Sequence, residues 1–167
     1  HETEPPKAAN HSPRTAVIGV GNLLLKDEGV GVHVVQAMQK ASLKSKDELT
    51  IIDGGTCPDT FYLLPQGLDK LIIVDAARGG GKPGTLYRFT PQDIVFRRGT
   101  VTSLHQLGVA EGLNMIEHTG LNPQEVVIIG VEPKEIDWGL EMSPELQQRV
   151  PQIIELVRKE TGVAGID

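Results

Sequence analysis

The chain has 167 residues and a formal net charge of −6, with 22 Asp and Glu residues against 16 Lys and Arg residues. This length fits one domain, which buries roughly two-thirds of its unfolded surface. The acidic balance and the absence of a basic run argue against nucleic-acid binding, because phosphate recognition needs clustered Lys and Arg. We therefore expect a partner that is uncharged or partly basic.

Cysteine content and hydropathy indicate the cellular compartment in which the protein is expected. Cys57 is the only cysteine, so no disulfide can form within the chain, and a cytoplasmic protein is expected. No apolar stretch approaches the roughly 20 residues of a membrane-spanning helix, so no membrane partner is expected. Residues 1–13 carry three prolines and few apolar side chains. They are typical of a disordered tail or a cloning remnant, which leaves a single domain at residues 14–167.

Short apolar runs rich in β-branched residues predict strands buried on both faces of a parallel sheet. The predicted strands are residues 15–20, 49–53, 70–75, 85–89 and 126–131. The fourth of them alternates polar and apolar residues and is expected to run antiparallel. Because helical patterns separate these strands, the sequence predicts an α/β domain of three layers, helix–sheet–helix, around a twisted, mostly parallel sheet of about five strands.

Helix signals fall between the predicted strands. An amphipathic pattern begins at about Asp27, and Asp27 or its neighbour is expected to supply the capping oxygen at the helix start. A short helix is expected near residues 58–65. Ser103 begins an S-x-x-Q capping box, which predicts a helix from there to about His118.

The C-terminal helix and one loop carry the remaining signals. Ser143-Pro144 supplies an N-cap and a first-turn proline, and Gly162 marks the end of the helix. Pro151 is expected to kink or split it. Residues 78–84 contain too many glycines for regular structure, which predicts a mobile loop.

Gly19 and Gly21 follow the first predicted strand, where nucleotide-binding turns carry glycines. The dinucleotide fingerprint G-x-G-x-x-G needs a third glycine where Leu24 stands, and a Walker loop needs a glycine there too. Both patterns therefore fail, which disfavours a nucleotide-binding α/β domain. The plainer interpretation is that these glycines allow a tight turn between strand and helix.

Glu28, Asp75 and His105 each fall just past a predicted strand or in the first turn of the helix after it. In an open α/β sheet such positions converge on one crevice at the carboxyl edge. Two carboxylates and an imidazole suit a borderline divalent metal such as zinc or nickel. Each residue also has a structural explanation: the acids as helix-start and turn residues, the histidine as a helix-start residue.

Two further positions are candidates. Asp53 ends the second predicted strand, and with Gly54 and Gly55 it is a candidate for binding the substrate backbone. Cys57 partnered by His105 is an alternative nucleophile, because a helix start lowers the pKa of a thiol. Against this, single cysteines are usually small buried hydrophobes.

Five sequence blocks, taken together and in order, resemble the nickel-iron hydrogenase maturation endopeptidases. The blocks are GVGNLLLKDEGVG at residues 19–31, DGGT at 53–56, VDA at 74–76, SLHQLG at 103–108 and GVEP at 130–133. The first block is long and specific, whereas the others are short. The resemblance runs from about Thr15 to the last helix.

The resemblance implies an aspartyl-type or metal-dependent endopeptidase that removes the C-terminal extension of a hydrogenase large-subunit precursor after nickel insertion. Glu28, Asp75 and His105 match the family's metal-binding residues by position. The resemblance also implies that the nickel is carried by the substrate as a recognition element, and that the protease has no permanent cofactor. The alternative is a non-catalytic metal-dependent binding module or chaperone for a metalloenzyme precursor, which would use the same three ligands.

Overall fold

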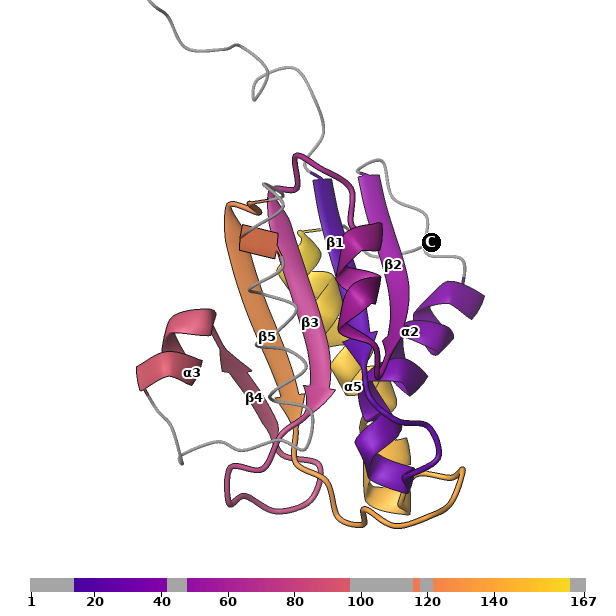
Figure 1. Ribbon diagram of the computed structural model, residues 1–167. Helices are drawn as coiled ribbons and strands as arrows, with labels where there is room; N and C mark the ends of the chain where they lie inside the picture. The colour runs from indigo at the N-terminus through magenta and orange to yellow at the C-terminus, as the bar shows by residue number, and fades with distance from the viewer. Residues whose placement is uncertain (1–13, 42–47, 97–115, 118–121, 163–167) are drawn as a thin grey trace, which may run out of the picture.

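The computed structural model describes residues 14–41, 48–96, 116–117 and 122–162. Their strands form one sheet in the order β2-β1-β3-β5-β4 (Figure 1). The bounds are β1 (Arg14–Val20), β2 (Glu48–Gly55), β3 (Lys70–Ala76), β4 (Leu86–Phe89) and β5 (Glu125–Val131). Only β4 runs antiparallel to its neighbour. The five predicted strands and the direction of the fourth are therefore confirmed.

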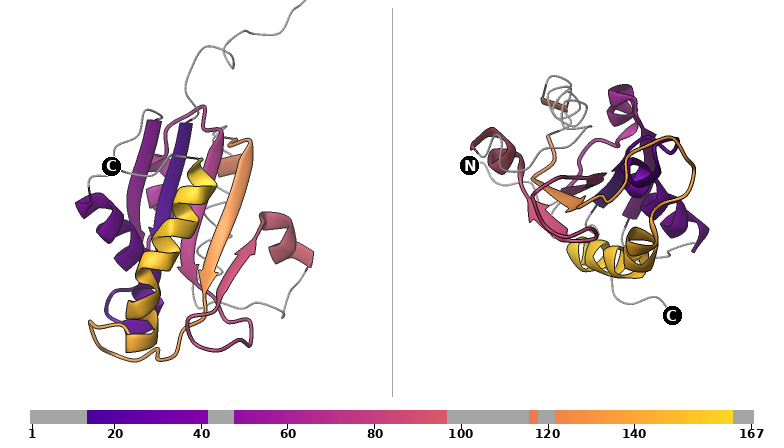
Figure 2. Two further views of the ribbon diagram at one scale, coloured as in Figure 1. Left: turned by 180° about the vertical axis from the view of Figure 1, so that it is seen from behind. Right: turned by 90° about the horizontal axis from the view of Figure 1, so that it is seen from below.

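Helices cover both faces of the sheet, as the two views of Figure 2 show. One face is covered by α2 (Val30–Lys40) and α5 (Pro144–Thr161), and the other by the 3-10 helix η2 (Pro58–Leu63). The 3-10 helix η1 (Lys26–Gly29) leads into α2, and α3 (Pro91–Phe96) follows β4. The predicted three-layer α/β arrangement is confirmed. Within the described ranges, every helix is too short or too polar to cross a bilayer.

The central strands divide their side chains between two apolar cores. In β3, Ile72 and Val74 pack toward α2 and α5, whereas Leu71 and Ile73 pack toward η2. All four side chains are fully buried. Because both faces of the strand are covered, its middle positions must be apolar, and residues 71–74 form a continuous apolar run in the sequence.

The C-terminal helix α5 is continuous for 18 residues with Pro151 inside it, so of the two expected alternatives, a kink or a split, the split is excluded. Proline removes one helical hydrogen bond, at a cost of about 3 kcal/mol. Pro151 lies on the exposed side, while Ile153 and Val157 are fully buried against the sheet and offset that loss. The helix starts after Ser143 and ends at Gly162 in the left-handed conformation, both as predicted.

The helix predicted to begin at Ser103 falls outside the described residues except at positions 116 and 117, which are helical. Ile116 is buried in the core on the η2 side of the sheet. The described end of this segment therefore lies over the same face as η2.

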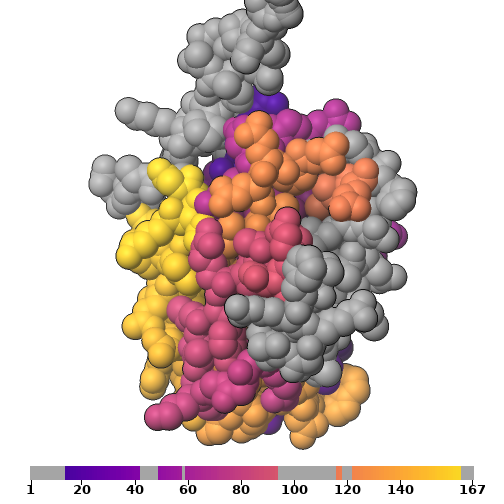
Figure 3. Space-filling model, turned by 90° about the vertical axis from the view of Figure 1, so that its left-hand side faces the viewer, coloured from indigo at the N-terminus to yellow at the C-terminus, as the bar shows by residue number. Residues whose placement is uncertain are grey.

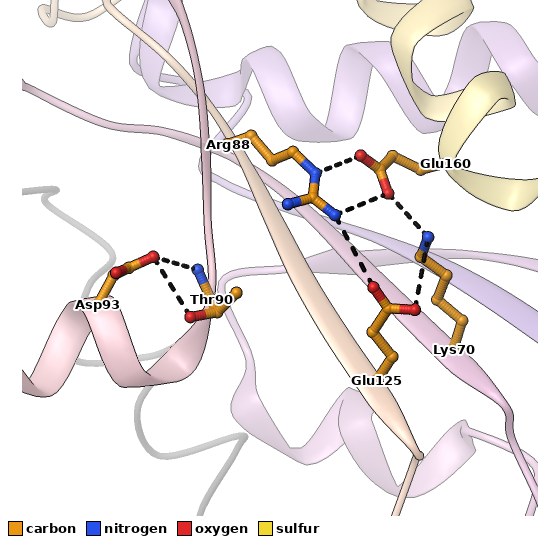
Figure 4. A network of polar contacts seen from close by, with 6 residues as sticks. All are labelled: Lys70, Arg88, Thr90, Asp93, Glu125 and Glu160. Carbon is orange, nitrogen blue, oxygen red and sulfur yellow. Dashed lines mark hydrogen bonds and ion pairs between the residues drawn. The ribbon is translucent and has the colours of Figure 1, made fainter.

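An ion-pair cluster ties the edge strand β4 to α5 (Figure 4). The Glu160 carboxylate pairs with Arg88 of β4 and accepts a hydrogen bond from Lys70 Nζ at 2.8 Å. Glu125 lies farther from the same two cations, at 3.7 Å from Lys70 and 3.8 Å from Arg88. The hydrogen bond from Arg88, together with Lys70, lowers the pKa of Glu160 below its usual 4.5.

Glu160→Gln is expected to lower the melting temperature near neutral pH, because Arg88 and Lys70 lose the carboxylate that they share. A carboxylate whose pKa is lowered by folding stabilises the protein above its unfolded pKa, and this stabilisation is lost as pH falls through the folded pKa. The difference in melting temperature between wild type and variant should therefore be largest above the ordinary glutamate pKa of 4.5 and should shrink as the pH falls below it.

The matched control is Glu155→Gln, on the same helix, because this carboxylate is exposed and, among the described residues, pairs with Arg158 alone, at 3.4 Å. Exposed pairs of this kind contribute about 0–1 kcal/mol, so the control should melt close to wild type at every pH. A Glu160→Gln difference that stays constant from pH 7 to 3 would contradict the assignment.

Candidate functional site

The four parallel strands end at one edge of the sheet, the lower edge in Figure 1, and the loops that follow them gather there. Seen from the β4 side, the loop after β3 lies against the loop after β5 along this edge (Figure 3). Crevices at the carboxyl ends of parallel strands are the usual ligand sites of open α/β sheets.

Glu28 lies in η1, where the backbone packs directly on the sheet. A Cβ added to Gly31 would lie 2.1 Å from the carbonyl oxygen of Val74 and 2.6 Å from that of Val20. Gly21 adopts φ +152°, and a Cβ there would lie 2.2 Å from the carbonyl oxygen of Glu28. Only glycine fits at such separations, which confirms the tight turn expected there and brings η1 against the ends of β1 and β3.

Asp75 lies at the end of β3, directly after Val74, and its Oδ1 accepts a hydrogen bond from the amide of Ala76 at 2.8 Å. Because Gly31 touches Val74 and η1 contacts β3, Glu28 and Asp75 lie on adjoining segments. Glu28 and Asp75 are each only 3 % exposed. The two carboxylates are thus buried at the carboxyl edge rather than open to solvent.

His105, the third predicted ligand, lies outside the described residues. In the described part of the chain, no three His, Cys, Asp or Glu side chains come close enough to hold a metal ion. What the structure describes of the predicted cluster is therefore Glu28 and Asp75. The histidine remains a prediction, as does metal binding by the three together.

Asp27, beside Glu28, is fully buried and fastens the loop after β5. Its Oδ2 accepts hydrogen bonds from the amides of Lys134 and Glu135, each at 2.8 Å. The amide of Ser143 donates to Oδ1 at 2.7 Å, and the Ser143 hydroxyl donates to Oδ2 at 2.8 Å. Because four donors bind one buried carboxylate, Asp27 holds the loop after β5 in place beside Glu28, the candidate ligand.

Ser143 occupies the N-cap position of α5 as predicted, but the capping hydrogen bonds expected from Asp27 or its neighbour and from Ser143 are absent. Neither η1 nor α2 has a side-chain capping bond, and Ser143, although it precedes α5, gives its hydroxyl to Asp27 instead. A buried carboxylate surrounded by four donors is stabilised more than one that caps a solvated helix end. Sequence reasoning missed this role because Asp27 and Ser143 are 116 positions apart.

The Asp53-Gly54-Gly55 turn lies at the same edge, at the end of β2. Asp53 is exposed, and its carboxylate accepts hydrogen bonds from Gln36 Nε2 and the Gly55 amide, each at 3.1 Å. The Gly55 carbonyl accepts from the amide of Gly21 at 2.8 Å, and the space beside Gly55 is open. This turn therefore adjoins the Gly21 turn, and its role in substrate binding remains a prediction.

Cys57 is a free, exposed cysteine, not the buried hydrophobe that single cysteines usually form. Its amide donates to the Gly54 carbonyl at 3.3 Å, just before η2 begins. The histidine proposed as its partner in the nucleophile alternative, His105, is outside the described residues.

Glu132, directly after β5, is a buried carboxylate that sequence reasoning did not single out. Its Oε1 accepts hydrogen bonds from the amides of Gly79 and Gly81, at 2.8 and 3.2 Å, and from the Tyr87 hydroxyl at 2.5 Å. Burial, followed by the bond to Glu132, raises the pKa of Tyr87.

The loop at residues 78–84 is irregular, as predicted, and its hydrogen bonds to Glu132 hold it at the carboxyl edge of the sheet. The available signal was an acid near the carboxyl end of a buried strand, as Asp75 also is.

Comparison with known proteins identifies the class. The family model described as hydrogenase maturation protease matches residues 32–160. The hydrogenase expression/formation protein HupD of Rhizobium leguminosarum bv. viciae is 35% identical over 158 residues, covering 92% of this chain and 78% of the relative. The hydrogenase 2 maturation protease of Escherichia coli (strain K12) is 31% identical over 157 residues, covering 92% and 95%.

Solved structures agree with these relatives. The hydrogenase maturating endopeptidase HybD from E. coli superposes with a TM-score of 0.76 at 31% identity, covering 92% of this chain and 96% of that one. HybD from Thermococcus kodakarensis, a NiFe hydrogenase maturation protease, gives a TM-score of 0.76 at 27% identity, covering 88% and 98%. The fold and these likenesses define an α/β peptidase. The chain belongs to the hydrogenase maturation protease family, which confirms the predicted peptidase over the non-catalytic alternative.

Asp27→Asn is expected to lower the free energy of unfolding by about 2–3 kcal/mol. The side-chain NH2 group of the asparagine would replace one acceptor oxygen of Asp27, so a donor would face a donor and one buried hydrogen bond would be lost. Ser143→Ala removes one donor from the same carboxylate and should lower it by only about 1 kcal/mol. Urea unfolding of the two variants beside wild type measures both values. A smaller loss for Asp27→Asn than for Ser143→Ala would show that Asp27 is not the anchor of this loop.

Proposed function

We propose that this protease removes the C-terminal extension of a nickel-iron hydrogenase large-subunit precursor, and that nickel already inserted in the precursor is its recognition element. The observation that carries the proposal is the pair of buried carboxylates, Glu28 and Asp75, on adjoining segments at the carboxyl edge of the sheet. Membership of the hydrogenase maturation protease family supports the choice of substrate. His105 is the third ligand in this proposal.

Two carboxylates and one imidazole form an open ligand set. Closed structural zinc sites use four protein ligands, whereas three leave coordination positions for other groups. Such a set can accept a metal that is already held by the substrate, with substrate thiolates among the remaining ligands. The protein then contributes oxygen and nitrogen donors on a rigid support, because glycine packing and the Asp27 anchor fix the segment that carries Glu28.

The reaction itself is hydrolysis of one peptide bond. Water oxygen adds to the carbonyl carbon, the carbon–nitrogen bond breaks, and a proton passes to the leaving nitrogen. A carboxylate at the site can take the proton from that water, and the metal can polarise the scissile carbonyl. We propose that Asp53, with the backbone of Gly54 and Gly55, binds the substrate chain, since this turn is partly exposed beside the carboxylate pair.

We place the reaction in the cytoplasm. Cys57 is free and exposed, and such a thiol persists best in a reducing compartment. Substrate thiolates that hold nickel would be preserved by the same conditions.

Glu28→Gln, Asp75→Asn and His105→Ala are each expected to abolish precursor processing, because each removes one metal ligand. Conversion of nickel-loaded precursor, followed by gel shift or mass spectrometry, measures the loss. The isosteric amides keep the volume of the two buried side chains, so circular dichroism should show a folded protein. Cys57→Ser is the matched control and should keep wild-type activity. Loss of processing in a folded Cys57→Ser protein would favour the cysteine nucleophile instead.

Nickel-free precursor is expected to resist cleavage even at high enzyme concentration, and free zinc should not rescue it. The bonds between metal and ligand set form only with a loaded substrate, and about 4 kcal/mol of such binding gives roughly a thousandfold discrimination. Initial cleavage rates for loaded and nickel-free precursor, measured side by side, test this. Equal rates would remove the recognition role of the metal.

A further inference from the structure

Three large apolar side chains are exposed on the two loops beside Glu28. Leu24 is 51% exposed, Trp138 74% and Leu140 67%. Single exposed apolar residues are common on protein surfaces, whereas a group of large ones marks a contact surface. We call Leu24, Trp138 and Leu140 the apolar rim.

Backbone hydrogen bonds hold the two loops of the rim together. The amide of Gly139 donates to the Leu24 carbonyl at 2.9 Å, and the amide of Lys26 donates to the Gly139 carbonyl at 3.0 Å. Because Gly139 lies between Trp138 and Leu140 in the chain, these bonds bring both residues beside Leu24. The rim is thus built on paired backbone, which reduces the entropy lost when a partner binds.

Acidic side chains flank the rim. Asp137 and Glu141 are exposed on either side of it in the chain. The nearby cation Lys26 is engaged by Glu135 at 2.8 Å. A complementary partner must therefore present an apolar surface bordered by Lys or Arg. A second copy of this chain fits poorly, because symmetrical contact would bring the same acids together.

We propose that the apolar rim docks the folded body of the hydrogenase precursor, outside its metal and its cleaved segment, through an apolar surface bordered by basic side chains. The inference rests on the proposed function, because it takes the precursor as the partner. Leu24 and Glu28 share the short segment between β1 and α2, so a precursor that binds the rim contacts the segment that carries the proposed ligand Glu28. Trp138 is the natural anchor, since exposed tryptophans dominate the binding energy of many interfaces.

Nickel-free precursor allows docking to be measured separately, because it is expected to be neither cleaved nor bound through metal–ligand bonds. Trp138 is the only tryptophan of the chain, so 5-fluorotryptophan labelling gives a single fluorine resonance, which should shift when nickel-free precursor is added. Trp138→Ser should raise the Kd for nickel-free precursor by at least about tenfold, and Leu140→Ser by about fivefold. With loaded precursor, KM should rise by similar factors while kcat stays within about twofold.

Leu63→Ser is the matched control, because Leu63 on η2 is 67% exposed, as Leu140 is, but lies outside the rim. It should leave both Kd and KM unchanged. Glu141→Lys, which reverses one flanking charge, should slow association and weaken its dependence on salt.

Three results would overturn the docking proposal: no binding of nickel-free precursor by the wild-type protein, unchanged Kd in Trp138→Ser, or equal weakening by Leu63→Ser. A fluorine shift that depends on the concentration of this protein alone would show self-association and also overturn it. Failure of the wild-type protein to cleave loaded precursor, while Trp138→Ser still weakens binding of the nickel-free form, would instead refute the proposed function.

Discussion

The candidate site depends on one close packing contact, between the backbone at Gly31 and the carbonyl oxygens that end β1 and β3. With 2.1 Å between an added Cβ and the Val74 oxygen, any side chain at this position would push η1 and α2 away from the sheet. Glu28 would move with them, because it precedes Gly31 by less than one helical turn. On the other side of the segment, Asp27 binds the loop after β5 through four hydrogen bonds. Packing and hydrogen bonding together fix where the Glu28 backbone lies.

We propose that Asp27 also links recognition of the metal to recognition of the partner. Asp27 positions the loop that carries Trp138, and the segment of Glu28 also carries Leu24. We propose that the precursor is recognised at two places: the ligand set binds its nickel, and the apolar rim binds its surface. Neither contact needs to be strong alone, because the free energies of two contacts on one rigid support combine. This arrangement allows a docked precursor to be retained or released according to its metal content.

Local patterns predicted the strands well because β1, β3 and β5 are covered on both faces, which requires continuous apolar runs. They also located Glu28 and Asp75, since strand ends meet at one edge of a parallel sheet. Local sequence patterns could not predict contacts between segments that are distant in the chain. The partners of Asp27 lie more than 100 positions away, and Glu132 reaches back to Gly79. The local pattern also left open whether Pro151 kinks or splits α5, and the helix is continuous because burial of the opposite face outweighs the local penalty.

Zinc soaked into crystals of the protein, located by anomalous scattering, tests the proposed ligand set most directly. We predict an ion bound at the carboxyl edge of the sheet, with one oxygen each from Glu28 and Asp75 and a nitrogen of His105 about 2.0–2.2 Å away. The metal should disappear from crystals of Asp75→Asn and persist in crystals of Cys57→Ser. An ion bound elsewhere, or Glu28 and Asp75 side chains directed to opposite sides of the sheet edge, would contradict the account.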